Sequence, residues 1–404
     1  MRAICLYLHM HQPYRYKRYS IFEVSRDRNY WDCDYYDKQS NQRIFEKVAE
    51  KSYHPTLDLL ERSLEKYPGF KVSLSITGTW LDQAREWDPS LIEQLQRLVA
   101  SKRVEIVAET YYHSLAFFYD QQEFEDQVKQ HMHKIKELFG VTPRVFRNTE
   151  LSYNDEIGKW ADDFGFKGVL AEGWDKVLGW RSPNHVYRPL GAKNARLLLK
   201  NYRLSDDIAF RFSNRHWKEW PLTVEKYQDW LNMDSLRGNL INLFMDFETF
   251  GEHQWADTGI FHFMDHLIYS WLKEYDNKFV TVSEACDIEP PVDEISMPQT
   301  VTWADTERDL SAWMGNSMQH EAVETLYNLK KSVYATNAAR IIEDFKRLTT
   351  SDHAYYMCTK YWNDGDVHAY FSAYDSPYDA FMYYMNVIRD IEYRISKAKQ
   401  SRIR

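Results

Sequence analysis

The sequence predicts an α/β fold in which parallel strands alternate with helices and close into a barrel, followed by a mainly helical region. Short apolar runs, each followed by a segment of helical periodicity, recur about seven times before Pro290-Pro291, as in a parallel barrel. Nearly every run ends in His, Glu, Asp, Arg or Trp. Beyond Pro291 the periodicity becomes that of long helices. We therefore expect a catalytic barrel over residues 1–290 and a helical C-terminal domain over residues 291–404.

The expected strands are short and apolar, as strands buried between helices are. They span residues 3–8, 71–76, 103–108, 143–146, 166–170, 197–202 and 240–245, with one further short strand over residues 278–282. Residues 16–53 are polar and lack clear periodicity, so we expect a long loop over the strand ends there.

The helices are marked by apolar stripes and by signals at their ends. One follows Pro55, carries three leucines at helical spacing, and stops before Pro68-Gly69. At the next, Asp88 is a helix cap and Pro89 takes the first helical position. Apolar periodicity predicts further helices over residues 124–138, 157–164, 261–272, 323–345 and 381–395.

The most informative stretch is the last long strand together with the polar residues after it. Residues 240–245 are continuously apolar, and Asp246, Glu248, Glu252 and His253 come directly afterwards. Side chains alternate along a strand, so Asp246 and Glu248 are expected on one face. Two carboxylates held close do not ionise independently, which suits acid/base chemistry on a sugar. A strand end whose charges simply meet solvent would have the same sequence.

The polar residues at the strand ends are expected to meet. In a parallel barrel the C-terminal ends of the strands converge on one mouth, where active sites lie. The residues expected there are His9, His11, Glu109, His113, Glu150, Glu172, Asp207, Asp246 and Glu248.

His9 and His11 share one face of the first strand and could bind a metal together with an acidic residue from another strand. The next residues, Gln12, Pro13 and Tyr14, favour hydrogen bonds to hydroxyl groups instead. A lone histidine pair is a weak metal signal, so we expect no metal and no other cofactor.

Glu150 follows Arg147, Asn148 and Thr149 at the end of the fourth strand. A carboxylate that accepts hydrogen bonds stays ionised, as the nucleophile of a covalent glycosyl-enzyme mechanism must. The alternative is an acidic residue near a helix N-terminus, although residues 152–155 form the better cap. The sequence has no nucleophile elbow and no glycine-rich phosphate loop.

Composition narrows the classes of partner. Aromatic residues make up 16% of the chain, with 29 Tyr and 14 Trp, which fits either an aromatic core or stacking on sugar rings. The net charge of −9 and the lack of a dense basic run argue against nucleic acid. The apolar N-terminal run is too short for a signal peptide or membrane span, so we expect a cytoplasmic protein without a membrane partner. The four cysteines have no metal-ligand spacing and are expected to be free thiols.

Five motifs, in order along the chain, resemble the conserved regions of glycoside hydrolase family 57, and most closely its α-amylase group. They are His-Gln-Pro at 11–13, Val-Glu-Ile-Val at 104–107 with His113 beyond it, Phe-Arg-Asn-Thr-Glu at 146–150, Met-Asp-Phe-Glu-Thr-Phe-Gly-Glu-His-Gln at 245–254, and Trp-Met-Gly-Asn-Ser-Met-Gln at 313–319. In the second region, Lys102-Arg103 stands where a glycine is common.

The resemblance implies an incomplete (β/α)7 TIM-like barrel followed by a mainly helical domain, a retaining mechanism and no catalytic metal. By position, Glu150 corresponds to the nucleophile and Asp246 to the general acid/base. The residues that correspond to positions near the substrate are His11, Glu105, His113, Glu248 and Trp313, and we add His9 and Asp207 as substrate-binding candidates from the strand ends.

The expected function is that of a retaining α-amylase that cleaves α-1,4-glucosidic bonds in an α-glucan or maltooligosaccharide. A 4-α-glucanotransferase or branching enzyme would use the same site, with a sugar hydroxyl in place of water. From other classes, a metal-dependent polysaccharide deacetylase would use His9 and His11 with an Asp, and a non-catalytic glucan-binding protein would use only the aromatic residues.

Overall fold

The computed structural model describes residues 2–33, 37, 40–360 and 372–403. Its centre is formed by two sheets of parallel strands. The first sheet joins β3 (Val104–Val107), β2 (Val72–Ile76), β1 (Arg2–Met10) and β8 (Leu240–Asp246), and the second joins β4 (Val145–Arg147), β5 (Gly168–Glu172) and β7 (Arg196–Lys200).

The two sheets meet at two seams and close into a barrel. At the first seam Ala108 forms a parallel bridge with Phe146, and at the second the Asn201 N–H donates to the Asn242 carbonyl oxygen over 2.9 Å. Because each seam has far fewer backbone hydrogen bonds than the paired strands, the barrel is incomplete. The predicted incomplete (β/α)7 fold is thus confirmed.

The expected short strand after the barrel is present as β9 (Asn277–Val280). It pairs with β1 over Arg2–Cys5, whereas β2 pairs with β1 only from Tyr7 onward. Two further strands, β6 (Val186–Pro189) and β10 (Glu294–Ile295), pair with each other beside β7 and were not predicted. They are too short and too polar to show a periodic pattern.

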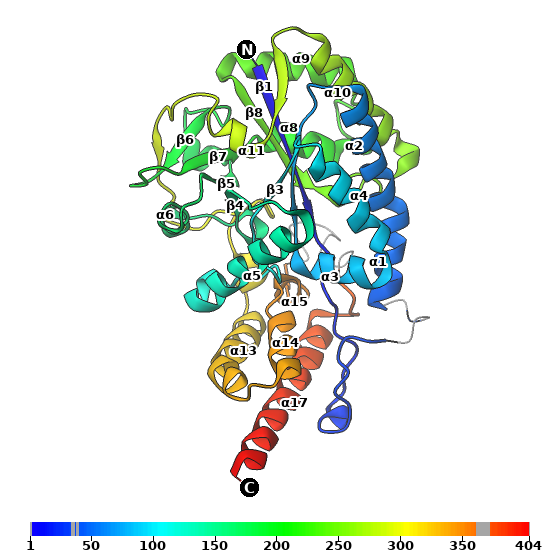
Figure 1. Ribbon diagram of the computed structural model, residues 1–404, viewed down its shortest axis with the longest axis vertical. Helices are drawn as coiled ribbons and strands as arrows, with labels where there is room; N and C mark the ends of the chain where they lie inside the picture. Colours follow the sequence, from blue (N-terminus) through cyan, green and yellow to red (C-terminus); the bar gives the residue numbers. More distant parts are fainter. Residues whose placement is uncertain (1, 34–36, 38–39, 361–371, 404) are drawn as a thin grey trace.

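Helices cover the outside of the barrel (Figure 1). The predicted ones are α2 (His54–Lys66), α4 (Pro89–Ala100), α5 (Gln121–Phe139), α6 (Asp155–Phe164) and α10 (Ile260–Lys273). Those not predicted are α3 (Gly78–Trp87), α7 (Asp175–Leu178), α8 (Tyr202–Asp206), α9 (Val224–Asp234) and α11 (Val282–Ala285). In the described part of the chain, no helix has the length and apolar character that crossing a membrane requires.

The expected long loop over residues 16–53 is wrong for its last part, from Asn41 onward. Residues Asn41–Val48 form α1, which continues as a π-helical turn to Tyr53, because Phe45, Val48 and Tyr53 pack into the barrel's outer core. The described residues before α1 lie partly over the strand ends, where Arg18 and Asp37 line a cleft. The aromatic residues of this segment, among them Tyr16 and Trp31, are buried against the C-terminal helices.

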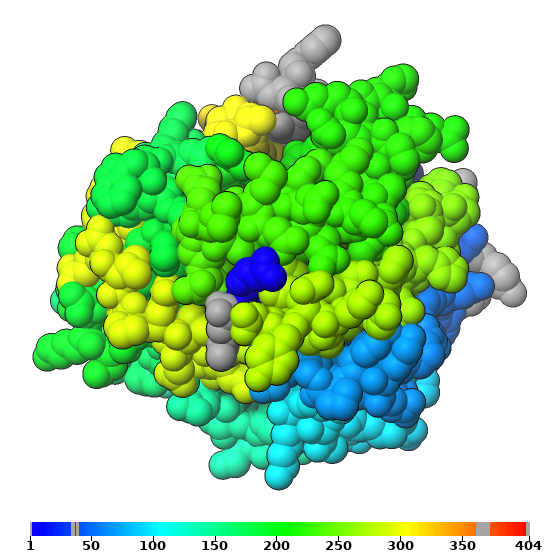
Figure 2. Space-filling model, turned by 90° about the horizontal axis from the view of Figure 1, so that it is seen from above, coloured from blue at the N-terminus to red at the C-terminus, as the bar shows by residue number. Residues whose placement is uncertain are grey.

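The C-terminal region is helical, as expected, and consists of α12 (Ser311–Met314), α13 (Ser317–Ala335), α14 (Ala339–Leu348), α15 (Ser351–Tyr355) and α17 (Pro377–Ile403). In Figure 1, β1 runs from the N-terminus down toward these helices, so the C-terminal strand ends face them. Figure 2 shows the opposite end, where the first residues of β1 reach the surface among residues from the middle of the chain. The domain boundary after residue 290 stays a prediction.

Candidate active site

A cleft with a volume of about 1330 Å³ opens where the barrel mouth meets the C-terminal helices. Seven of the predicted site residues line it, namely His9, His11, His113, Glu150, Asp246, Glu248 and Trp313. They come from four strand ends and from α12, so the fold brings together residues that are up to about 300 positions apart in the chain. A cleft of this size admits a chain of several sugar units.

Glu150 lies in a short 3₁₀ turn just after β4, with its backbone in the left-handed region at φ 58°. This conformation is costly for a residue other than glycine and is concentrated at functional sites. One carboxylate oxygen lies 3.0 Å from Nε2 of His113, and the other accepts a 3.1 Å hydrogen bond from the Trp303 indole. Burial opposes ionisation, but the hydrogen bond and charge of His113 hold the pKa of Glu150 below its usual value.

His113 also adopts a left-handed backbone, at φ 52°, and its ring lies between two carboxylates. Nε2 of the ring contacts Glu150, and Nδ1 lies 3.6 Å from Oε2 of Glu109. Burial lowers the pKa of His113, but the bonds to Glu109 and Glu150 outweigh it and raise that pKa to about 9. At neutral pH, His113 is therefore an imidazolium that stabilises the charge on Glu150.

Asp246 is the last residue of β8, and its side chain is 36% exposed to the cleft. Its Oδ1 is 3.5 Å from Nδ1 of His9. Burial raises the pKa of Asp246, but the hydrogen bond and charge of His9 outweigh burial and leave this pKa below its usual value. Asp246 is thus the accessible carboxyl of the expected pair, and it lies on a different strand from Glu150.

Glu248 does not continue the strand as predicted, because β8 ends at Asp246 and a 3₁₀ turn (Phe247–Thr249) follows. Its Oε1 accepts hydrogen bonds from the Tyr53 hydroxyl at 2.8 Å and the His11 N–H at 3.3 Å. Burial, and then the charge of Asp246, raise the pKa of Glu248 to about 8. At neutral pH the two carboxyls therefore hold one proton, on Glu248.

His11 lies between barrel and helical region. Its Nδ1 is 3.0 Å from the Thr77 hydroxyl and its Nε2 is 2.9 Å from Oδ2 of Asp352, in α15. Its ring stacks on that of His113, with centroids 4.0 Å apart. Burial, and then the charge of His113, lower the pKa of His11 to about 4, so this ring is neutral at pH 7.

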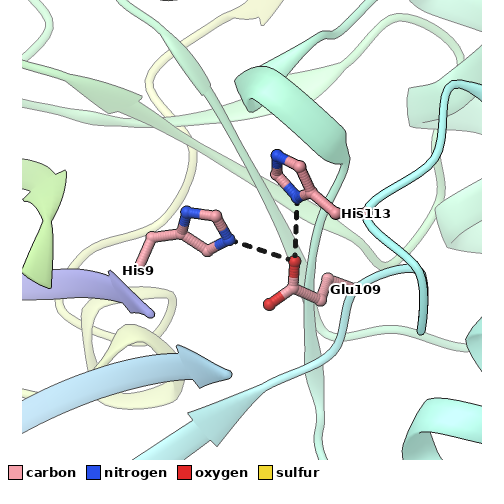
Figure 3. Close-up of side chains that lie close together, drawn as sticks. All are labelled: His9, Glu109 and His113. Carbon is pink, nitrogen blue, oxygen red and sulfur yellow. Dashed lines mark hydrogen bonds and ion pairs between the residues drawn. The ribbon is translucent and has the colours of Figure 1, made fainter. Parts of the chain in front are cut away.

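The arrangement of His9, Glu109 and His113 (Figure 3) is unsuited to a cation. Oε2 of Glu109 faces both rings, and the buried Arg147 guanidinium is 3.6 Å from the same oxygen. A metal ion there would meet this fixed positive charge and the imidazolium of His113. The expected absence of a metal stays a prediction.

Four of the expected residues do not line the cleft, namely Glu105, Glu109, Glu172 and Asp207. Glu105 lies near the start of β3, and its carboxylate accepts from the N–H of Ser283, 2.9 Å away, and from the Ser283 hydroxyl. Asp207 pairs with Arg211 over 2.6 Å within the π-helical turn that follows α8. Glu172, also expected at the mouth, is buried and pairs with Lys200 and Arg308.

Three residues near the reacting groups were not predicted. Trp303 and Ser351 each donate a hydrogen bond to the carboxylate of Glu150, the latter over 3.2 Å. Asp352 contacts the ring of His11. All three come from beyond the barrel. The segment around Trp303 is irregular and α15 is five residues long, so neither carries a periodic pattern that points to a site.

Comparisons with known proteins agree with this fold and with the cleft. The model of glycosyl hydrolase family 57 matches residues 5–298. A protein of Methanocaldococcus jannaschii named "Putative alpha-amylase" is 43% identical over 400 residues, covering 96% of this chain and 84% of that protein.

Two solved structures share the fold at low sequence identity. The branching enzyme of family 57 from Thermococcus kodakaraensis has a TM-score of 0.65 at 14% identity, over 88% of this chain and 86% of that one. The 4-alpha-glucanotransferase from Thermococcus litoralis has a TM-score of 0.63 at 15% identity, and this chain spans 56% of its length. With the family match and the 43% relative, these findings show that the chain is an enzyme of glycosyl hydrolase family 57.

Proposed function

We propose that this enzyme hydrolyses α-1,4-glucosidic bonds in α-glucans or maltooligosaccharides, with retention of configuration, using Glu150 as nucleophile and Asp246 as general acid/base. The observation that carries the proposal is that His113 and Trp303 contact the carboxylate of Glu150 at hydrogen-bond distance, in the cleft that Asp246 also lines. The relative named as an α-amylase supports the bond type.

In the first step an oxygen of Glu150 attacks the anomeric carbon and the bond to the leaving oxygen breaks. Asp246 donates a proton to that oxygen, so the leaving chain departs as an alcohol. A bound sugar chain that excludes water from Asp246 raises the pKa of this carboxyl. Asp246 therefore takes up a proton from solvent as the chain binds, and it is this proton that it donates.

In the second step Asp246, now a carboxylate, takes a proton from water, and the water oxygen attacks the anomeric carbon. The ester bond to Glu150 breaks and its electron pair returns to the carboxylate. The imidazolium of His113 and the Trp303 N–H stabilise this negative charge as it reappears.

The stereochemistry of the first product tests the mechanism. Time-resolved NMR of fresh maltooligosaccharide hydrolysis should show the α-anomer before mutarotation. Initial release of the β-anomer would exclude Glu150 as a covalent nucleophile.

Glycosyl transfer is the second candidate, because the cleft volume leaves room for an acceptor chain as well as a donor. The names of the two structural relatives describe transfer reactions. Incubation with one defined maltooligosaccharide separates the two functions. Products longer than the substrate indicate transfer, whereas only shorter products indicate hydrolysis.

The remaining alternatives have simple tests. Prolonged chelation should leave turnover unchanged, and a stoichiometric zinc that turnover requires would favour a deacetylase. Release of reducing sugar from maltooligosaccharides excludes a protein that only binds glucans.

A further inference from the structure

We propose that Glu109 is a positioning residue which holds His9 and His113 in one chain of hydrogen bonds and ion pairs, and through them aligns both reacting carboxylates. The inference rests on the proposed function, because it takes Glu150 and Asp246 as the reacting groups. Glu109 itself does not line the cleft, so it acts through the histidines and not on substrate.

The geometry places Glu109 at the centre of this chain (Figure 3). Its Oε2 is 3.2 Å from Nε2 of His9 and 3.6 Å from Nδ1 of His113. The second nitrogen of each ring faces a reacting carboxylate, at 3.5 Å for Asp246 and 3.0 Å for Glu150. Each histidine thus bridges Glu109 and one reacting group.

Glu109 is buried, so its negative charge must be compensated by its neighbours. The side chain of Glu109 is 0% exposed, and a buried carboxylate is costly unless cations or donors compensate it. Burial opposes ionisation, but the positive charge of His9, the hydrogen bonds from both rings and the charge of Arg147 hold the pKa of Glu109 well below its usual value. Glu109 is therefore a fixed negative charge behind the two histidines.

This charge matters most in the covalent intermediate. Once Glu150 is esterified, it no longer carries the negative charge that holds the proton on His113. In the second step, however, the imidazolium of His113 must stabilise the Glu150 carboxylate as it re-forms. Glu109 then remains as the carboxylate that His113 contacts directly. It keeps the ring protonated and turned toward Glu150 through the whole cycle.

Several charged or titratable groups face His113 and bear on its proton. They are Glu109, Glu150, Arg147, His9, His11 and Asp352. Of these carboxylates, Asp352 contacts His11 and not His113. Replacing Glu109 by Gln therefore removes the direct acidic partner of His113 that stays a carboxylate throughout the reaction.

The test is Glu109→Gln, assayed for kcat, KM and pH profile. We expect kcat to fall by about 100-fold, as for loss of an aligned proton-transfer group, with KM changed by less than about threefold. On the alkaline side both the general acid and His113, whose pKa is about 9, lose their protons. Without the charge of Glu109 the ring loses its proton more easily, so the alkaline limb should move to lower pH by more than about half a pH unit.

The matched control is Glu123→Gln. Glu123 is equally buried, but it accepts from Gln127 and Tyr334 at the contact between α5 and α13, away from the cleft. This variant should keep the wild-type kcat and alkaline limb, even where it lowers thermal stability. A Glu109→Gln enzyme that loses stability like the control, but keeps kcat and the alkaline limb, would show that Glu109 is only structural.

A second variant covers the case in which Glu109→Gln does not fold. Glu109→Asp keeps the charge but withdraws it by one methylene, so kcat should fall by about 10-fold or more while the alkaline limb stays within about half a pH unit. Wild-type kcat in this variant would overturn the proposal. Failure of the proposed function is separate, since it appears in the wild-type enzyme as β-anomer release or in Glu150→Gln as full activity.

Discussion

The two ends of strand β3 carry the same residue type in different surroundings. Near its start, Glu105 is partly exposed and accepts from the N–H and hydroxyl of Ser283 in the first turn of α11. Just past its end, Glu109 is fully buried between two histidines. The strands converge with their C-terminal ends on the cleft, so the position along the strand decides the role and the residue type does not.

The largest effect is expected from substitutions of the two reacting carboxyl groups at the barrel mouth, Glu150 and Asp246. Glu150→Gln and Asp246→Asn should each lower kcat by about 10³-fold or more with the fold intact, because each removes a reacting group. The double variant should lose little more than either single one, since both groups act in one mechanism. Steady-state kinetics with circular dichroism as the folding control measures this. A folded Glu150→Gln protein with wild-type turnover would remove the assignment.

Asp352 tests whether the helical region takes part in the site. Asp352→Asn removes the negative partner of His11 without opening a cavity, so we expect kcat/KM to fall by about 10-fold. His11 remains neutral at pH 7, so the loss should come from misplacement of the ring and should not depend on pH between 6 and 8. Unchanged kcat/KM would confine the active site to the barrel.

Glu248→Gln should affect stability more than a mouth carboxyl normally would. The unfolded protein ionises this group above its ordinary pKa of 4.5, whereas the folded protein keeps it protonated up to about pH 8. Wild-type stability therefore falls as pH rises from about 4.5 to 8, and glutamine, which needs no proton, avoids this loss.

The expected gain for the Glu248→Gln variant in free energy of unfolding is on the order of a few kcal/mol at pH 8, and it should vanish near pH 4.5. Urea unfolding at several pH values measures it. A difference that does not change with pH contradicts the protonated state of Glu248.

The smallest effect on catalysis is expected at the other end of β3. Glu105→Gln should change kcat/KM by less than about twofold and lower the free energy of unfolding by about 1 kcal/mol, because a hydrogen-bond acceptor for Ser283 is weakened. A loss comparable to that of the mouth variants would restore the substrate role that the family resemblance implied.

The sequence predicted those parts of the site that follow regular strands. His9, Glu150 and Asp246 each come directly after or at the end of an apolar run, and the convergence of strand ends in a barrel brings them together. Glu105 was assigned by motif alone, although its place at the start of its apolar run pointed to the far end of the barrel.

The contributions from beyond the barrel could not be predicted in this way. Ser351 and Asp352 reach the site because α15 packs at the mouth, a tertiary contact that no local pattern encodes. Likewise, the aromatic residues between 16 and 31 gave no periodic signal, because they pack on helices made from the other end of the chain. Long-range packing of irregular segments is the physical limit of pattern-based prediction.

The hydrogen bond between His11 and Asp352 spans 341 positions, and this separation has a consequence for synthesis. A ribosome releases the barrel residues long before it makes α15, and domains fold as their segments emerge. A nascent barrel can therefore form with Glu150 and Asp246 in place while Glu150 lacks Ser351 and His11 lacks its carboxylate partner. The enzyme becomes fully competent only when α15 has been made and has docked, so full activity appears late in synthesis.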